Sequence, residues 1–257
     1  MAPARRTGGG SRSGTLRRDR GVFLRRVEMA PDAPRNGYPF DLPAVRRLHR
    51  IRFRQVTFLV GDNGSGKSTV VEALAVLAGF NAEGGSRNLL FETFATHSTL
   101  CDHIRPMWQE HPRWGWFLRA ETFYGMASHI ASDNGLAPTF GDLHAESHGE
   151  SFLDLALSRF SGRGLYILDE PEAALSAQGQ LTLLRLMHES CCQGSQFIVA
   201  THSPMLMAFP GAAIVHLDST GAQDLTWEEV PAVQLWRRYL DDPSSVLHHL
   251  LEDDPDT

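Results

Sequence analysis

The segment 61–68 reads Gly-Asp-Asn-Gly-Ser-Gly-Lys-Ser, in which two glycines enclose four residues and are followed by Lys67 and Ser68. Residues with this spacing hold a triphosphate: backbone N–H groups cradle the phosphates, the ammonium reaches the β- and γ-phosphates, and the hydroxyl binds Mg²⁺. The apolar run 56–60 predicts a strand before the loop, and 68–77 predicts a helix after it. We therefore expect nucleotide contacts from Gly61, Asn63, Gly64, Ser65, Gly66, Lys67, Ser68 and Thr69.

Lys67 is the only lysine in the chain, and the other 23 basic residues are arginines. A chain that uses arginine everywhere else but keeps one lysine inside this loop indicates that the position requires a compact ammonium group. We therefore expect Lys67 to contribute to catalysis as well as to binding.

Two acidic residues, Asp169 and Glu170, follow the apolar run 165–168, which predicts a second buried strand. Ligands of open α/β sheets bind at the carboxyl ends of the strands, so both carboxylates would lie near the phosphate loop. There Asp169 would join Ser68 in holding Mg²⁺, and Glu170 would polarise the attacking water.

A third apolar strand is predicted over 197–200, and Thr-His-Ser-Pro follows it. A histidine at a strand end can detect a γ-phosphate through an imidazole N–H. His202 would stand where the neighbouring strand of the sheet ends, so we expect it to act with Lys67 and Glu170 in catalysis.

A further Ser- and Gly-containing segment, Ser147-His148-Gly149-Glu150, precedes the apolar helix that is predicted over 150–160. A helix start of this kind binds anions, and one chain does not need two such sites for one triphosphate. We therefore expect Ser147, Gly149 and Glu150 to complete the nucleotide site of another subunit. The alternative is an ordinary capped helix start.

A length of 257 residues with 42% hydrophobic content favours one large globular domain. Residues 1–54 carry 14 arginines against four acidic residues, although the whole chain has a net charge of −6. Such a basic start can bind polyanions, or it can be an inert solvated arm. We expect a disordered basic arm over 1–21, the main domain over 22–217 with a helical insertion at about 81–160, and a helical tail over 218–257.

No stretch of the sequence reaches the roughly 20 consecutive apolar residues that a membrane helix needs, and no secretory signal is evident. The three cysteines, Cys101, Cys191 and Cys192, fit free thiols in a reducing compartment. We expect a cytoplasmic protein with no direct membrane insertion. The sequence indicates no metal chemistry beyond Mg²⁺.

Together these segments resemble the ABC-type P-loop ATPases, in which 61–68 corresponds to Walker A, 147–150 to the signature, 165–170 to Walker B and His202 to the switch histidine. Asp-Glu-Pro-Glu-Ala-Ala-Leu-Ser at 169–176 and Ala-Thr-His-Ser-Pro at 200–204 are similar to the soluble branch near RecF, the SMC proteins and the overcoming-lysogenisation-defect nucleases. The sequence most resembles small stand-alone AAA/ABC ATPases of that branch. The family signature Leu-Ser-Gly-Gly-Gln has become Glu-Ser-His-Gly-Glu at 146–150.

The resemblance implies an α/β fold of the P-loop NTPase type. It has an ABC-like mixed sheet core, an N-terminal antiparallel β portion and a small helical subdomain. The glutamine that lies near the metal in the family has no clear match, and Glu121 is our candidate for its position. Tyr38 or Phe40 would stack on adenine, or either could belong to the core.

The resemblance also implies a head-to-tail homodimer that closes on ATP with Mg²⁺ and opens after hydrolysis. Our first hypothesis is a motor or switch of a DNA-maintenance or defence assembly, with DNA or a separately encoded effector as partner. The alternative is the ATP-binding subunit of an ABC transporter, which Glu172 and the missing glutamine disfavour. A small-molecule kinase would share only the phosphate loop, and we rank it last.

Overall fold

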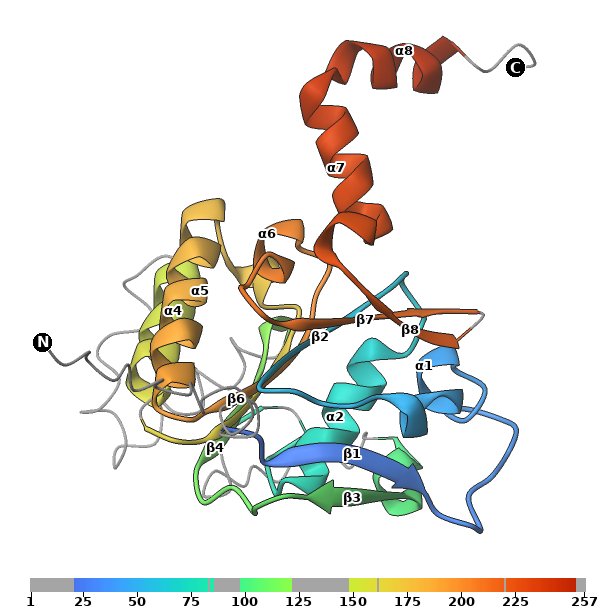
Figure 1. The fold of residues 1–257 in the computed structure, drawn as a ribbon, viewed down its shortest axis with the longest axis vertical. Helices are drawn as coiled ribbons and strands as arrows, with labels where there is room; N and C mark the ends of the chain where they lie inside the picture. Colours follow the sequence, from blue (N-terminus) through green and yellow to red (C-terminus); the bar gives the residue numbers. More distant parts are fainter. Residues whose placement is uncertain are drawn as a thin grey trace, which may run out of the picture.

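The computed structural model describes residues 21–82, 84–85, 98–121, 148–160, 162–219 and 221–252. Its main layer is a six-stranded sheet in the order β4-β5-β6-β2-β7-β8 (Figure 1). Five of these strands run parallel, and β8 is antiparallel to its neighbour β7. The strands are β2 (Val56–Val60), β4 (Gly115–Arg119), β5 (Leu165–Asp169), β6 (Gln196–Ala200), β7 (Ala213–Asp218) and β8 (Gly221–Leu225).

The central strands are buried on both faces, because every residue of β2, β5 and β6 is buried. Side chains alternate between two apolar layers: Tyr166 and Leu168 belong to one cluster, and Leu165 and Ile167 belong to the other. Continuous apolar runs are typical of parallel strands that are covered by helices on both sides.

Helices cover the two faces of this sheet (Figure 1). The face that bears α2 (Lys67–Leu77) also carries a second, two-stranded sheet, in which β1 (Leu24–Met29) pairs antiparallel with β3 (Ile104–Trp108). On the other face α4 (His148–Arg159) and α5 (Ala177–Cys192) lie side by side. The shorter helical elements are α1 (Pro43–Arg46), η1 (Leu48–Arg50), η2 (Thr99–His103), η4 (Pro171–Ala174), α6 (Pro204–Met207) and η5 (Trp227–Glu229).

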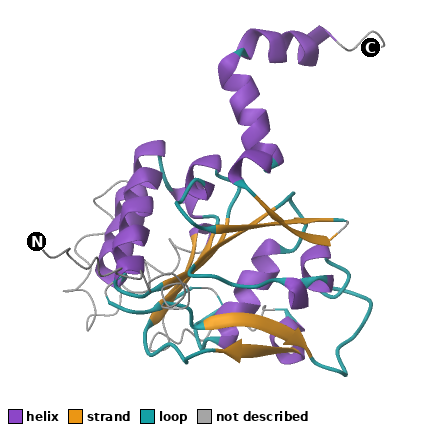
Figure 2. Cartoon of the chain, viewed as in Figure 1, coloured by secondary structure: helices purple, strands orange, loops and turns teal. Residues whose placement is uncertain are grey.

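Two further helices, α7 (Pro231–Asp241) and α8 (Pro243–Glu252), extend away from the body of the molecule (Figure 2). None of the helices in the described ranges is long and apolar enough to cross a membrane.

The predicted fold class is confirmed: the protein has an α/β core with a mixed sheet and an antiparallel β portion near the N-terminus. The residues that we predicted as a helical tail, 218–257, contain the last residue of β7 and then β8, a strand that was not predicted. Only Gly21 of the predicted arm 1–21 lies within the described residues. Much of the predicted insertion, 81–160, lies outside them.

A buried glutamine joins the main sheet to the N-terminal strand. Gln196 is fully buried at the start of β6, and its side-chain oxygen accepts hydrogen bonds from the backbone N–H groups of Phe23 at 2.8 Å and Leu24 at 2.9 Å. Its amide nitrogen donates to the carbonyl oxygens of Leu24 at 2.8 Å and Arg54 at 2.9 Å. One side chain therefore satisfies four backbone groups at a point where three chain segments meet.

Replacing Gln196 by leucine should lower the free energy of unfolding by on the order of 3–5 kcal/mol, because buried backbone groups would lose their partners without gaining water. Urea denaturation of the full chain measures this. The matched control is Gln178→Leu, at an exposed position of α5. Equal unfolding midpoints for the two variants would contradict the role assigned to Gln196.

Candidate functional site

The phosphate loop connects β2 to α2, and its glycines adopt conformations that other residues avoid. Gly66 is the N-cap of α2 with φ 96°, and Gly61 has φ 145°. A Cβ on Gly61 would lie 2.1 Å from the carbonyl oxygen of Leu217 on β7, so no side chain fits there. Ala44 N–H donates to the Ser65 carbonyl at 3.0 Å, which fixes the loop against α1.

The Lys67 ammonium lies inside the curve of this loop. It donates to the carbonyl oxygens of Gly61 at 2.9 Å and Asp62 at 3.0 Å, and the residue is only 4% exposed. Burial lowers the pKa of Lys67, and the negative charges of Glu170 and Asp169 offset part of this effect. The arrangement holds a positive charge beside the N-terminus of α2, where phosphate groups bind in such loops.

Asp169 ends β5 as a nearly buried carboxylate that is partly paired. Its Oδ2 accepts a hydrogen bond from Arg119 Nε at 3.0 Å, whereas its Oδ1 is buried without a hydrogen-bond partner. Burial raises the pKa of Asp169, and the Arg119 guanidinium offsets part of that rise. A buried carboxylate oxygen without a partner calls for a cation or a water molecule.

This carboxylate borders a cleft of about 480 Å³. Its lining residues are Ser68, Arg119, Ala120, Glu121, Asp169, Glu170, Ala173 and Ala174. Hydroxyl and carboxylate oxygens are the ligands that Mg²⁺ prefers. The donor set of Ser68 and Asp169 therefore fits the predicted magnesium site.

Glu170 has the left-handed backbone conformation, with φ 49° and ψ 49°, and is the only residue other than glycine with positive φ within the described ranges. This conformation costs on the order of 1–3 kcal/mol and recurs at functional sites. A hydrogen bond from Glu170 N–H to the Ala200 carbonyl, at 2.9 Å, holds it in place. Its side chain is 44% exposed, so it is accessible to water and ligand.

The histidine loop is held by a second acidic residue, Glu172. Its carboxylate accepts hydrogen bonds from Thr201 Oγ1 at 2.7 Å and from His202 N–H at 2.5 Å. The His202 Nε2 atom lies 3.6 Å from Glu170 Oε1. Two of the three predicted catalytic side chains therefore stand next to each other, and Glu172 fixes the backbone that carries one of them.

Arg119, the last residue of β4, was not among the predicted site residues. Its guanidinium donates to Asp169 Oδ2 and, through Nη2, to Glu72 Oε2 of α2 at 2.9 Å. The side chains of Arg119 and Glu72 are only 16% and 14% exposed. Burial alone would lower the pKa of Arg119, but the two carboxylates outweigh it and the pKa is raised. A charged residue ending the apolar strand 115–118 was the only signal in the sequence.

The remaining predicted residues are only partly placed. Glu121 is exposed and lines the same cleft as Asp169. Ser147 lies outside the described residues, and Gly149 and Glu150 belong to the first turn of α4, where only the backbone is described. Asn63 and Gly64 lie on the exposed part of the loop, Ser65 is buried, and Thr69 follows Ser68 on α2.

The two candidates for adenine stacking differ in exposure. Phe40 is 5% exposed and packs edge-on against the His103 ring, with the ring centroids 5.3 Å apart. Phe40 is therefore part of the core and cannot stack on a base. Tyr38 is 72% exposed and is the only one of the pair that is accessible.

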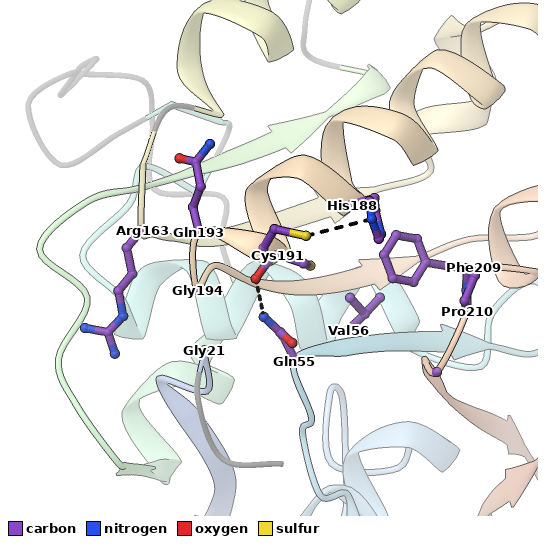
Figure 3. Close-up of a pocket in the computed structure, with 12 residues that line it drawn as sticks. Gly21, Gln55, Val56, Arg163, His188, Cys191, Gln193, Gly194, Phe209 and Pro210 are labelled. Carbon is purple, nitrogen blue, oxygen red and sulfur yellow. Dashed lines mark hydrogen bonds between the residues drawn. The ribbon is translucent and has the colours of Figure 1, made fainter. Parts of the chain in front are cut away.

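A larger hollow, of about 820 Å³, lies elsewhere (Figure 3). It is lined by Gln55 before β2 and by Gly194 before β6, so it lies at the edge where the strands begin. Cys192 Sγ there lies 3.8 Å from His188 Nε2. The phosphate loop and the carboxylates are at the opposite edge, and we place the functional site there because it has the chemistry that this hollow lacks.

Replacing Arg119 by methionine should destabilise the protein by about 3 kcal/mol at pH 7, because the carboxylates of Asp169 and Glu72 would lose the guanidinium that pairs with both. The difference in the free energy of unfolding between wild type and this variant should become smaller as the pH falls from 7 towards 4. Loss of the guanidinium would remove the interaction that offsets the raised pKa of Asp169. The unfavourable charge is therefore present above the folded-state pKa of Asp169 and is relieved by protonation below it. Urea denaturation at several pH values measures both effects.

The control for this variant is Arg185→Met, which removes an ion pair from the exposed face of α5, where Arg185 is 80% exposed. It should change the stability by less than about 0.5 kcal/mol at every pH. A similar loss in the free energy of unfolding for both variants, independent of pH, would show that the pairing of Arg119 with Asp169 and Glu72 adds no more stability than an exposed ion pair.

Comparisons with known proteins show which sequences this chain is similar to. Residues 56–100 and 142–208 match the family model described as "AAA domain, putative AbiEii toxin, Type IV TA system". The cytochrome c biogenesis ATP-binding export protein CcmA of Rhodopseudomonas palustris is 30% identical over 158 residues, which cover 58% of this chain and 79% of the relative. The CcmA protein of Bartonella quintana is 31% identical over 186 residues, covering 63% of this chain and 86% of the relative.

Among solved structures, the SMC head domain from Thermotoga maritima is 20% identical, with a TM-score of 0.41, and the match covers 68% of this chain and 92% of that one. Family membership rests on the sequence matches, which span most of each relative. The phosphate loop, the carboxylates of β5 and the histidine loop all fall within the matched family model. The chain therefore belongs to the AAA/ABC-type P-loop ATPases and is an enzyme that binds and hydrolyses ATP.

Proposed function

We propose that ATP hydrolysis in this site drives the closing and opening of a head-to-tail homodimer. The observation that carries the proposal is the convergence of Lys67, Ser68, Asp169, Glu170 and His202 at one edge of the sheet, beside a cleft that is open to ligand.

The residues of the loop, 61–69, would hold the phosphates, and Lys67 would neutralise the charge that develops between the β- and γ-phosphates. Glu170 would accept a proton from water as its oxygen attacks the γ-phosphorus and the bond to the bridging oxygen breaks, releasing ADP and phosphate. His202 would donate a hydrogen bond to the γ-phosphate. Magnesium, held by Ser68 and through water by Asp169, would supply positive charge at the β- and γ-phosphates.

A second subunit would complete the site through the start of its α4. The sequence places Ser147, Gly149 and Glu150 at this helix start, and a helix N-terminus favours the negative γ-phosphate. ATP would then hold the two subunits together only while its γ-phosphate contacts both of them. A ligand shifts the equilibrium between the open and the closed dimer only by the difference in its affinity for these two states.

We propose that ATP hydrolysis drives a DNA-maintenance or defence assembly. Support comes from the arginine-rich start of the chain, from Thr-His-Ser-Pro at 201–204, and from the family description, which names a toxin of a toxin–antitoxin system. The alternative is the ATP-binding subunit of an exporter, and the names of the CcmA relatives support it.

Complementation tests the composite site. Lys67→Ala and Ser147→Arg should each abolish ATPase activity, and Ser147→Arg should still bind ATP. A mixture in equal amounts should recover roughly a quarter of wild-type activity, because half of the randomly formed dimers contain one intact site of two. Glu170→Gln, which retains ATP binding, should lower kcat by about 10²–10⁴-fold and serves as the catalytic control.

Full ATPase activity of Ser147→Arg by itself would contradict the composite site and indicate an enzyme that works as a single chain. In that case ATP hydrolysis stands, and only the dimer mechanism fails.

Whether DNA is a partner can be tested separately with duplex DNA. If DNA is a partner, it should stimulate ATP hydrolysis severalfold at 50 mM salt, and the effect should decline steeply by about 200 mM, because phosphate contacts release counterions. Deleting residues 1–20 should weaken this response without changing the basal rate. No response to DNA at either salt concentration would favour the exporter alternative.

A further inference from the structure

The C-terminal arm, defined here as α7 and α8 (residues 231–252), carries an apolar surface that the described residues of the body do not cover. Val233, near the start of α7, is buried. Beyond it both helices extend away from the sheet, and α8 turns away from the end of α7 (Figure 1). Seven large apolar side chains of the arm are between 36% and 75% exposed: Leu235, Trp236, Tyr239, Leu240, Leu247, Leu250 and Leu251.

The spacing of these residues is that of a buried helix face. On α7 they recur at 235, 236, 239 and 240, which places them along one stripe of the helix. Gln234, Arg237 and Arg238 occupy the remaining surface of α7 and are also exposed. A stripe of this kind faces a core in ordinary helices, but here it faces solvent.

The exposed area is large enough to form a stable interface. A fully exposed large side chain offers about 150–250 Å², so the seven residues offer on the order of 600–1,000 Å² at their observed exposures. Monomers rarely expose apolar patches above roughly 300–600 Å². A standard interface buries about 800 Å² on each partner.

The position of the arm favours a second copy of this chain as the partner. Val230, Pro231 and Ala232, where α7 begins, line a small cavity together with Gly61 of the phosphate loop and His202. The arm therefore starts at the nucleotide edge of the head. That is the edge where the proposed function places the second head, and this step rests on that proposal.

The symmetry of a homodimer supports the same partner, because an isologous interface sets the same surface of each copy against itself and so can cover the apolar stripe of both chains at once.

We propose that the C-terminal arm is a dimerisation element that pairs with the arm of a second copy, independently of ATP. Paired arms would keep the two heads at a high effective concentration, so that closure on ATP becomes an intramolecular step.

Light scattering on the full chain without nucleotide tests this. Wild type should have twice the chain mass of 28.5 kDa. Leu240→Glu/Leu251→Glu should have the mass of one chain, and both positions are exposed, at 69% and 75%, so the fold of the main domain should be unaffected. The control is Leu181→Glu, at an exposed leucine of α5, which should remain dimeric.

A monomeric wild type would overturn the proposal, and so would a dimer that survives the double substitution. The apolar stripe could instead bind a membrane surface. Sedimentation with vesicles of phosphatidylcholine, with and without phosphatidylglycerol, tests this alternative. If wild type is monomeric and sediments with them while the double variant does not, the arm binds a membrane surface and the proposal is wrong.

The two proposals can fail separately. If the arms pair but the composite site is wrong, Lys67→Ala and wild type are both dimeric without nucleotide, and Ser147→Arg keeps its ATPase activity. If the composite site is right but the arms do not pair, complementation succeeds while the double arm variant has the same mass as wild type. If both hold, the activity per chain of the arm variant should fall at least tenfold on dilution, while that of wild type stays constant.

Discussion

The parallel register of three central strands determines where every chemical group of the site lies. Asp169 of β5 pairs with Ala200 of β6, and Ala200 pairs with Leu59 of β2. These strands therefore end almost level, and the residues that follow them emerge at one edge. A shift of one residue would move every side chain of a strand to the opposite face of a sheet that is buried on both sides. Burial of both faces therefore fixes the strand register, and the register fixes the positions of the site residues.

The site separates its charges into two parts. On one side are the N–H groups of the loop, the start of α2 and the Lys67 ammonium, which together favour phosphate. On the other side Asp169, Glu170 and Glu172 gather. In the described part of the chain Arg119 donates to Asp169. The Thr201 hydroxyl and the His202 N–H donate to Glu172. A negatively charged nucleotide fits between these parts when it arrives with a divalent cation, because the cation faces the carboxylates while the phosphates face the loop.

Sequence patterns predicted the parts of the fold that depend on local or periodic signals. Continuous apolar runs indicated β2, β5 and β6, and the spacing of the two glycines with Lys67 indicated the phosphate loop. The strand β8 was missed because Gly221–Leu225 contains few apolar residues and lies at the edge of the sheet, where one ladder with β7 is enough to hold it.

The network around Arg119 could not be found from sequence for a different reason. Its partners Glu72 and Asp169 are 47 and 50 residues away, and they meet only because β4 pairs with β5 beside α2. The same holds for Glu172, whose hydrogen bonds to Thr201 and His202 cross from one strand end to the next. Phe40 and Tyr38 likewise differ only in what packs around them, which no spacing rule encodes.

The length of the arm adds an energetic constraint to its exposure. The helices α7 and α8 contain 11 and 10 residues, and isolated helices shorter than about 12–15 residues are marginal in water because nucleation fixes several residues for one hydrogen bond. Helices in proteins gain most of their stability by packing an apolar face. Since the described residues of the body cover only the start of α7, the exposed stripe is the face that is left to make a stabilising contact for the remainder. Pairing of two arms would supply that contact and would couple the folding of the arm to the assembly of the enzyme.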